Sequence, residues 1–439
     1  MAEASIESIK QFEHEVAQHV RWNFAVNILD VSFITFGLSL ISRETVMPLL
    51  ISKLTDSTIA IGLFSAIYTL GISLPQLIGA GMTEALPRKK PLVMLIGAVG
   101  ERLPYLFAGL AVLLFAQTMP LLALIAILLM FGLSGASAGF ATPAWFDMIA
   151  KVIPVQRRGL FTGLSHGLGA LMGVAGAAVI GIVLERATYP QNFALLFGIA
   201  FVAMIISWVG LALNREPASI SVRAPTSLKR YFQALPAILR GDRNFARYLI
   251  AMVVVRAGTM AGGFLIVYGV QRFQLGGAEI GLLTGVLIGC QAILNPLWGT
   301  LGDRRGHKMV LVGGAIALAL ATLVAFVMPS WPWLVVAFLL IGAFISADSA
   351  SFLTILPEFC RDEDRPTYIG LTNTLMAPVA ALAPLIGGWI AAQFGFPTMF
   401  ACASIFAIIG AILLWRWVRE PRGQASIGVA PILREQPVE

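Results

Sequence analysis

A few ionisable side chains lie inside long runs of apolar residues. They are Asp30, Glu101, Arg102, His166, Arg256 and Asp348. A charge at bilayer depth is costly, so it persists where it faces a partner, a ligand or a water-filled cavity. Carboxylates can take up protons, an arginine can bind an anion through its planar donors, and a histidine titrates near neutral pH. These side chains are therefore the candidates for contact with a solute or a proton.

Each candidate also has a structural interpretation. Arg256 lies near the middle of its apolar run, where it could form an ion pair with Asp30 or Glu101 instead of binding a ligand. Glu101 and Arg102 are adjacent, and neighbours on a helix point about 100° apart, so we expect them to have different partners. His166 lies among glycines, where a hydrogen-bonded packing role competes with a titrating role.

The composition explains why these charges stand out. Apolar residues make up 58% of the 439-residue chain and charged residues 12%, and the mean hydropathy is +0.85. Soluble domains carry roughly 25% charged residues, so this chain has too little polar surface to cover a water-soluble globule. We therefore expect membrane lipids to be its main solvent and the fold to be an all-α membrane protein.

The sequence also argues against several function classes. The net charge of +7 comes from basic residues spread over loops without a nucleic-acid-binding motif, so we expect no nucleic-acid partner. The three cysteines have neither disulfide nor metal-ligand spacing. The chain has no nucleophile–base set and no Gly-x-x-x-x-Gly-Lys-Ser/Thr loop, which argues against an enzyme and against an ATP-driven motor. We expect no metal and no other cofactor.

Apolar runs predict twelve membrane-spanning helices. Their ranges are 22–48, 59–81, 92–116, 120–147, 159–184, 191–213, 246–271, 279–301, 309–328, 331–356, 366–393 and 397–418. Residues 214–245 are rich in proline and basic residues, which predicts a cytoplasmic linker between two six-helix bundles, 1–213 and 246–439. Residues 5–21 are interpreted either as an interfacial amphipathic helix or as a solvated tail.

The basic residues set the expected orientation. With the N-terminus inside, 24 of the 30 Lys and Arg fall in segments on the cytoplasmic side and 3 on the outer side. Cytoplasmic loops of membrane proteins carry an excess of Lys and Arg. We therefore expect a multi-pass protein of the cell (plasma or inner) membrane with both termini in the cytoplasm.

The two halves of the chain resemble each other. The matching segments are Gly62-Leu63 with Gly281-Leu282, Gly163-Leu164 with Gly370-Leu371, and Arg215-Glu216-Pro217 with Arg419-Glu420-Pro421. Their offsets are 219, 207 and 204 residues, as small deletions in a duplicated unit would produce. At an offset of 226, Asp30 would correspond to Arg256. The pattern indicates a duplicated six-helix unit.

A short charged segment joins two apolar runs that contain no charge. It is Gly299-Thr300-Leu301-Gly302-Asp303-Arg304-Arg305-Gly306-His307-Lys308, which we interpret as a tight loop. It resembles the loop signature of the major facilitator superfamily of transporters, Gly-x-Leu-x-Asp-Arg-x-Gly-x-Lys, with His307 where that family usually has Arg. A duplicated set of twelve helices is also the architecture of that family.

The resemblance implies two pseudo-symmetric six-helix bundles in which helices 1, 4, 7 and 10 line a central cavity. Asp30, Arg256 and Asp348 then become the first candidates for substrate or proton contact. It also implies that the charged loop and its counterpart in the first half latch the cytoplasmic side as a gate. The gate candidates are Glu84, Arg88, Asp147, Gly299, Asp303, Arg304, Gly306, Lys308 and Glu358.

Two pairings follow for this gate. We expect Asp147 to pair with Arg88, and Glu358 to be the partner of the second-half charges. The alternative is that the loop bases only fix the membrane topology.

By this resemblance, we expect secondary-active transport of a small organic solute by alternating access, with proton coupling. Two alternatives from other classes are a lipid flippase and a transport-inactive sensor or scaffold that retains the fold. The expected partners are a small-molecule substrate, protons and membrane lipids, with the protein a monomer.

Overall fold

The computed structural model describes residues 6–83, 86–219, 240–360 and 365–422, and every regular element in these ranges is a helix. The first half contains α1 (Ile6–Leu40), α2 (Val46–Leu54), α3 (Thr58–Thr83), α4 (Lys90–Ile96), the π-helix η1 (Gly97–Arg102), α5 (Leu103–Phe115), α6 (Pro120–Val152), α7 (Val155–Arg186) and α8 (Gln191–Ala212). The second half contains α10 (Arg243–Gly258), η2 (Thr259–Ala261), α11 (Phe264–Phe273), α12 (Gly277–Arg305), α13 (His307–Val327), α14 (Pro332–Ser351), η3 (Leu356–Glu358) and α15 (Arg365–Arg416).

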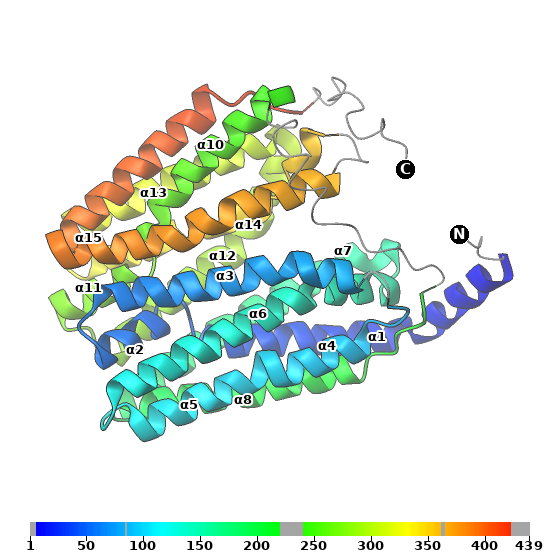
Figure 1. Ribbon diagram of the computed structural model, residues 1–439, viewed down its shortest axis with the longest axis horizontal. Helices are drawn as coiled ribbons and strands as arrows, with labels where there is room; N and C mark the ends of the chain where they lie inside the picture. The colour runs from blue at the N-terminus through cyan, green and yellow to red at the C-terminus, as the bar shows by residue number, and fades with distance from the viewer. Residues whose placement is uncertain (1–5, 84–85, 220–239, 361–364, 423–439) are drawn as a thin grey trace, which may run out of the picture. The chain divides into compact units, whose positions relative to one another are not determined.

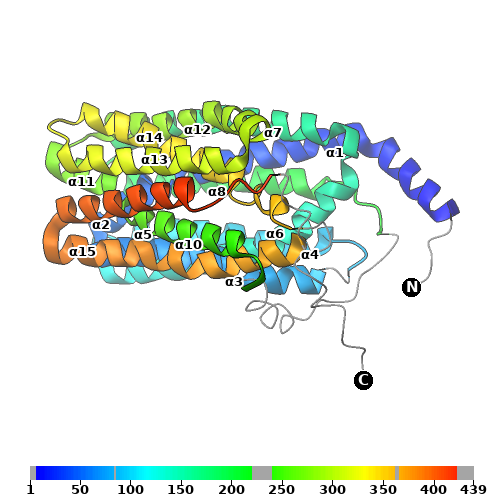
Figure 2. The same cartoon turned by 90° about the horizontal axis from the view of Figure 1, so that it is seen from above.

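Within the described ranges, eleven helical stretches are long and apolar enough to cross a membrane. The last of them contains two crossings. It runs from Tyr368 to Arg416, and 49 residues at about 1.5 Å each far exceed a hydrocarbon core of about 30 Å. Gly395, with φ 83° and ψ 162°, interrupts it. The orange and red arms of α15 turn back on one another in Figures 1 and 2, so the predicted number of twelve spans is confirmed.

Three predicted spans are not single regular helices. The first span, 22–48, is wrong at its end, because α1 stops at Leu40 and α2 begins at Val46. The third span contains the π-helix η1, and the seventh is divided by the 3-10 turn η2. A π-helix inserts an extra residue into the helical ladder, and such insertions are frequent at functional sites.

Two segments differ from their expected local structure. Residues 299–305 are helical rather than a loop, because α12 continues to Arg305 and the chain turns at Gly306 alone. Gly306 has φ 96°, a conformation that L-residues with side chains rarely adopt. Near the N-terminus, α1 begins at Ile6, so residues 6–21 are a helical extension of the first span rather than a frayed tail.

The chain forms two compact units. Unit 1 comprises residues 1–56, 67–226 and 274–285, and unit 2 comprises residues 57–66, 227–273 and 286–439. In unit 1, α1 packs against α7 and α8, and α5 packs against α6 and α8. In unit 2, α10 and α13 both pack against α15, and α13 also packs against α14.

Each unit has a buried apolar core close to one end of its helices. In unit 1, Met148, Val152 and Phe161 belong to it. In unit 2, the core is rich in aromatic rings, and the tilted rings of Phe245 and Tyr368 have centroids 4.5 Å apart. Burial of such rings dominates the energy of a core and fixes the helices that carry the charged side chains described next.

Candidate functional site

Arg256 and Asp348 form an ion pair in unit 2. Arg256 lies near the end of α10, and Asp348 lies on α14. The Nη2 of Arg256 donates to both Asp348 carboxylate oxygens at 2.8 Å. The two side chains are 17% and 19% exposed. The expected pairing of Arg256 with Asp30 or Glu101 is wrong, because Asp348 already holds the guanidinium in a charge-assisted contact.

The guanidinium of Arg256 has donors that this pair does not use. Its Nε is buried and has no hydrogen-bond partner among the described residues. Its Cζ lies 4.7 Å from the centroid of the Phe352 ring, so the ring supports one face of the guanidinium plane. The hydroxyl of buried Tyr248 donates to the Phe352 carbonyl at 3.0 Å, which ties this backbone to α10. The arginine is thus held in position with part of its donor edge free.

A second ion pair lies in unit 1. Arg102, at the end of η1, has its Nη2 3.8 Å from Oδ1 of Asp30 on α1. Ser207 on α8 donates to Oδ1 of Asp30 at 2.6 Å, and Trp145 on α6 donates to Oδ2 at 3.3 Å. Both charged side chains are nearly buried, at 4% and 5% exposed.

Arg102 uses all of its nitrogens. Its Nε donates to the Met204 carbonyl at 3.0 Å, and its Nη1 donates to the Gly97 carbonyl at 3.0 Å and to Glu101 at 3.1 Å. Its Nη2 donates to the Ser207 hydroxyl at 3.1 Å. The expectation that Glu101 and Arg102 have different partners is therefore wrong, because their side chains meet alongside the wider π turn.

The two ion pairs differ in how fully they are satisfied. The Asp30–Arg102 pair has hydrogen-bond partners from several helices, as a structural charge pair needs when buried. The Arg256–Asp348 pair is more exposed and leaves the Arg256 Nε without a partner. Glu101 is 26% exposed and contacts Arg102 through one oxygen.

His166 lies exposed on α7. In the part of the chain that the structure describes, it takes part in no recorded hydrogen bond or ion pair, so the packing interpretation gains no support. Gly163 and Gly167, close to it in sequence, face open space. The structure thus brings His166 to neither ion pair.

The gate candidates of the second half have other partners than expected. Asp303 is 78% exposed and lies 3.8 Å from His307, and Arg304 is exposed. Lys308 donates to the Trp415 carbonyl at 3.1 Å. The expected pairing of Glu358 with these charges is wrong, because Glu358 lies 3.6 Å from Arg422.

Arg422 was missed in the sequence, although it directly follows the repeated Arg-Glu-Pro segment. Its Nη1 donates to the Asp303 carbonyl at 2.8 Å, and its Nη2 donates to the Gly302 carbonyl at 3.2 Å. These carbonyls belong to the last turn of α12, where a cation complements the helix dipole. Burial and the neighbouring Glu420 carboxylate raise the pKa of Glu358, which the Arg422 charge partly offsets.

In the first half, Glu84 lies outside the described residues. Arg88 is exposed, and the expected pair of Arg88 with Asp147 is wrong, because Asp147 lies 3.7 Å from Lys89 and 3.4 Å from Lys151. Lys89 is 5% exposed at its side chain, and this burial lowers its pKa against the opposing effect of the Asp147 carboxylate.

Glu216 is a further residue that sequence reasoning did not select. Its side chain is 1% exposed. Its Oε1 accepts from the Lys89 backbone N–H at 2.9 Å and from Lys151 Nζ at 2.9 Å, and its Oε2 accepts from the Lys90 backbone N–H at 2.7 Å. The carboxylate therefore joins the chain after α8 to the start of α4 and the end of α6. Its position in the repeated Arg-Glu-Pro segment was the sequence feature that could have identified it.

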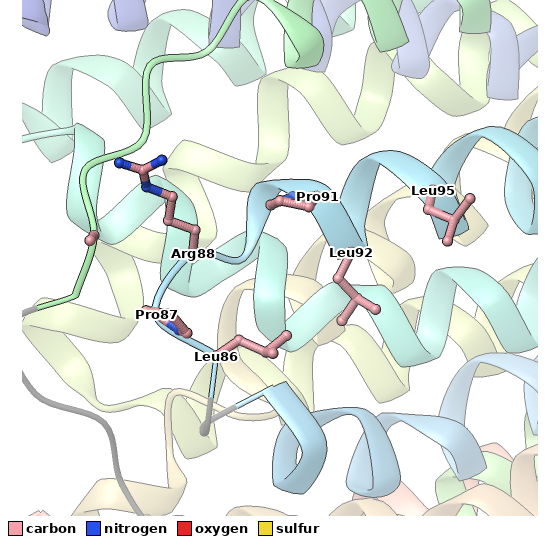
Figure 3. Close-up of a pocket in the computed structure, with 7 residues that line it drawn as sticks. Leu86, Pro87, Arg88, Pro91, Leu92 and Leu95 are labelled. Atoms are coloured by element: carbon pink, nitrogen blue, oxygen red, sulfur yellow. The ribbon is translucent and has the colours of Figure 1, made fainter.

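An open pocket lies beside this cluster on unit 1. Its lining residues belong to the chain before α4, to α4 itself and to the chain after α8. They are Leu86, Pro87, Arg88, Pro91, Leu92, Leu95 and Ala218. Figure 3 shows the Arg88 and Leu92 side chains leaving the backbone on opposite sides. The pocket lining contains none of the four residues of the two ion pairs. In the described ranges, no group of three or more His, Cys, Asp or Glu side chains could hold a metal ion.

Comparisons with known proteins agree with this architecture. Residues 32–276 and 248–435 match the family model described as Major Facilitator Superfamily. The chain is 29% identical over 211 residues to the 3-(3-hydroxy-phenyl)propionate transporter of Escherichia coli K12, which covers 47% of each chain. It is 26% identical over 208 residues to multidrug resistance protein MdtG of Yersinia enterocolitica, which covers 46% of this chain and 48% of that protein. The matches thus span about half the length of these relatives.

Solved structures share the fold. A point mutant of the nucleoside transporter NupG superposes with a TM-score of 0.69 at 12% identity, covering 90% of this chain and 100% of that one. A bacterial homologue of the human lysosomal transporter Spinster, in an inward-facing and unoccupied conformation, gives 0.67 at 13% identity, covering 93% and 98%. With the family model matching nearly the whole chain, this multi-pass membrane protein belongs to the Major Facilitator Superfamily.

Proposed function

We propose that this protein is a secondary-active transporter that moves a small organic solute across the membrane by alternating access. The observation that carries the proposal is the Arg256–Asp348 pair, a half-satisfied ion pair inside two membrane-spanning helices. Charged side chains in membrane-spanning helices are paired or face a cavity, and they commonly mark the path of a substrate or an ion. Membership of a family whose matched relatives carry transporter names supports the same proposal.

Proton coupling is part of the proposal, and Asp348 is the group that would carry the proton. It is more exposed than Asp30, and its recorded side-chain partner is a single nitrogen of Arg256. Asp30 is held by Ser207, Trp145 and Arg102, so a change in its protonation would disturb three helices. We assign Asp30 and Arg102 a structural role and leave Glu101 and His166 without an assigned step.

For the membrane arrangement, we propose cytoplasmic termini in the cell membrane, six-helix halves 1–213 and 246–439, and a cytoplasmic linker at 214–245. The gate proposal now centres on Glu216 in the first half and Arg422 in the second. Each joins the segment after a half's last span to the ends of other helices. Asp303 and Arg304 are exposed, which fits the alternative that loop charges set topology.

The proposal is tested with purified protein in liposomes under an imposed pH gradient. A panel of small organic solutes is offered, and internal pH is followed with a trapped fluorescent dye. Solute-dependent proton movement that disappears in Asp348→Asn, but not in the exposed-site control Asp303→Asn, is the expected result. Solute flux without proton movement would remove the coupling, and no flux with any solute would favour a sensor or scaffold. Movement of labelled lipid between leaflets would favour a flippase.

A further inference from the structure

The hydrogen bonds recorded for Arg256 use only part of its planar guanidinium group. A guanidinium has five N–H donors, and the bonds to Asp348 use one nitrogen, Nη2. The Nε is buried and unpartnered, and in the described part of the chain no bond from Nη1 is recorded. A buried donor without a partner costs free energy, so a ligand that supplies an acceptor there binds with a gain.

The position of the guanidinium is set by its surroundings. The Phe352 ring lies against one face at 4.7 Å, and the Phe352 backbone is tied to the fully buried Tyr248. The plane of the guanidinium is therefore fixed. Its Nε–H and one Nη2–H point to the same side of the plane, so they form a two-pronged edge once Asp348 has released Nη2. A planar donor edge matches the two oxygens of a carboxylate, which accept two parallel N–H bonds.

We propose that the transported solute carries a carboxylate and that Arg256 binds it in place of Asp348. This inference rests on the proposed transport function and names the substrate class of the same site. With Asp348 protonated, Arg256 would present a single positive charge, which matches a monocarboxylate better than a phosphate dianion or a cation.

The exchange has a defined charge balance. When the solute carboxylate takes the Arg256 donors, the Asp348 carboxylate loses its counter-charge. A proton from water then binds an Asp348 oxygen, so one anion and one proton enter the site together and its net charge is unchanged. The charged and titratable groups recorded near Asp348 are Arg256 and Tyr248, and the buried Tyr248 hydroxyl is engaged with a backbone carbonyl. The proposal thereby links the substrate class to proton coupling.

Arg102 provides an internal comparison. It is also an intramembrane arginine opposite an aspartate, but all its nitrogens have protein partners. It has no free donor edge for a ligand. An Arg→Lys change at each position therefore separates a binding arginine from a structural one, because lysine keeps the charge and loses the planar donor geometry.

The test measures ligand binding to the purified protein in lipid nanodiscs by thermal shift and by titration. The probes are lactate, benzoate and 3-phenylpropionate, each beside its neutral amide. In the wild type, at least one carboxylate should stabilise the protein and its amide should not. Arg256→Lys should weaken that affinity by about tenfold or more, because a two-pronged contact is lost. Arg102→Lys should lower the melting temperature and leave the dissociation constant of the folded protein unchanged.

Asp348→Asn keeps the experiment decisive if Arg256→Lys does not fold. Removing the competing carboxylate should tighten carboxylate binding and abolish its dependence on pH. Equal stabilisation by acid and amide, unchanged affinity in Arg256→Lys, or unchanged affinity in Asp348→Asn would overturn the inference. Binding of none of the carboxylates would also overturn it. If neutral or cationic solutes are still transported in liposomes, the transport function stands while the substrate class falls; absence of all transport removes both.

Discussion

Replacing Glu216 with glutamine removes one negative charge from a buried cluster without removing bulk. The Glu216 carboxylate accepts two backbone N–H bonds at the start of α4 and one bond from Lys151. Its side chain is 1% exposed, so water cannot replace these partners. We expect Glu216→Gln to destabilise unit 1 clearly.

The magnitude follows from the three bonds. The amide oxygen of glutamine can keep the place of Oε1 and its two bonds, but the amide NH2 then faces the Lys90 N–H, which is also a donor. Losing one hydrogen bond to a charged group costs about 1.5–3 kcal/mol. Lys151 and the buried Lys89 lose a neighbouring counter-charge, which brings the sum to about 3 kcal/mol, at the lower end of the cost of breaking a buried ion pair.

The assay is thermal unfolding of the purified protein in detergent or nanodiscs. A loss of about 3 kcal/mol corresponds to a fall in melting temperature of about 6–12 °C for a unit of roughly 200 residues. Glu15→Gln is the matched control, because Glu15 is exposed on α1 and has no recorded ion pair among the described residues. A melting temperature for Glu216→Gln that equals that of Glu15→Gln would refute the reasoning.

Three further predictions concern packing, topology and pH. In Gly387→Ala, the new Cβ would lie 2.5 Å from a backbone oxygen in unit 2, so the melting temperature should fall by several degrees, whereas Gly289→Ala, facing open space, should leave it unchanged. In a protein without its native cysteines, Lys53→Cys should react with an impermeant maleimide from outside intact cells, and Arg305→Cys should react only in inside-out vesicles; the reverse pattern would reverse the topology. Burial raises the pKa of Glu358 above 4.5, so its folded state binds a proton more readily than its unfolded state. Stability should therefore fall as pH rises from about 4.5 through that raised pKa, and the fall should be smaller in Glu358→Gln.

Much of the fold was predictable because a membrane constrains it strongly. A span must be about twenty apolar residues long and must satisfy its own backbone, so hydropathy alone locates most crossings. The interruptions were not predictable in the same way. The π-helix at Gly97–Arg102 and the 3-10 turn at Thr259–Ala261 lie within apolar runs of ordinary composition, and they depend on the helices packed around them.

The members of the two intramembrane ion pairs were predictable, but their pairing was not. Asp348 and Arg256 stood out because charges are rare in apolar runs, yet no spacing in the sequence connects residues 92 positions apart. For the adjacent Glu101 and Arg102, helix geometry predicted different partners, whereas their long side chains reach one another at the end of the π-helix η1. Buried acids such as Glu216 lie outside the spans, where an acidic residue is ordinary and attracts no attention.

The internal repeat shows which contacts the two halves share. Asn23 donates to the Arg215 carbonyl and accepts from its N–H, at 3.0 and 2.9 Å. Asn244 makes the same pair of bonds with Arg419, at 3.0 and 2.8 Å. In each half, an asparagine near the start of the first span therefore holds the backbone that leaves the last span. This clamp bonds to backbone atoms, so it is compatible with many surrounding side chains.

The intramembrane charges do not follow the same symmetry. At the repeat offset, Asp30 corresponds to Arg256, so the same helix carries an acid in one half and a base in the other. Asp30 has its arginine on the third span, whereas Arg256 has its acid on the tenth. The duplicated scaffold thus holds two ion pairs of opposite arrangement, one satisfied by the protein and one left open. In the proposed transport of a carboxylate, the open pair would exchange its acid for the solute, while the satisfied pair would hold α1, η1 and α8 together.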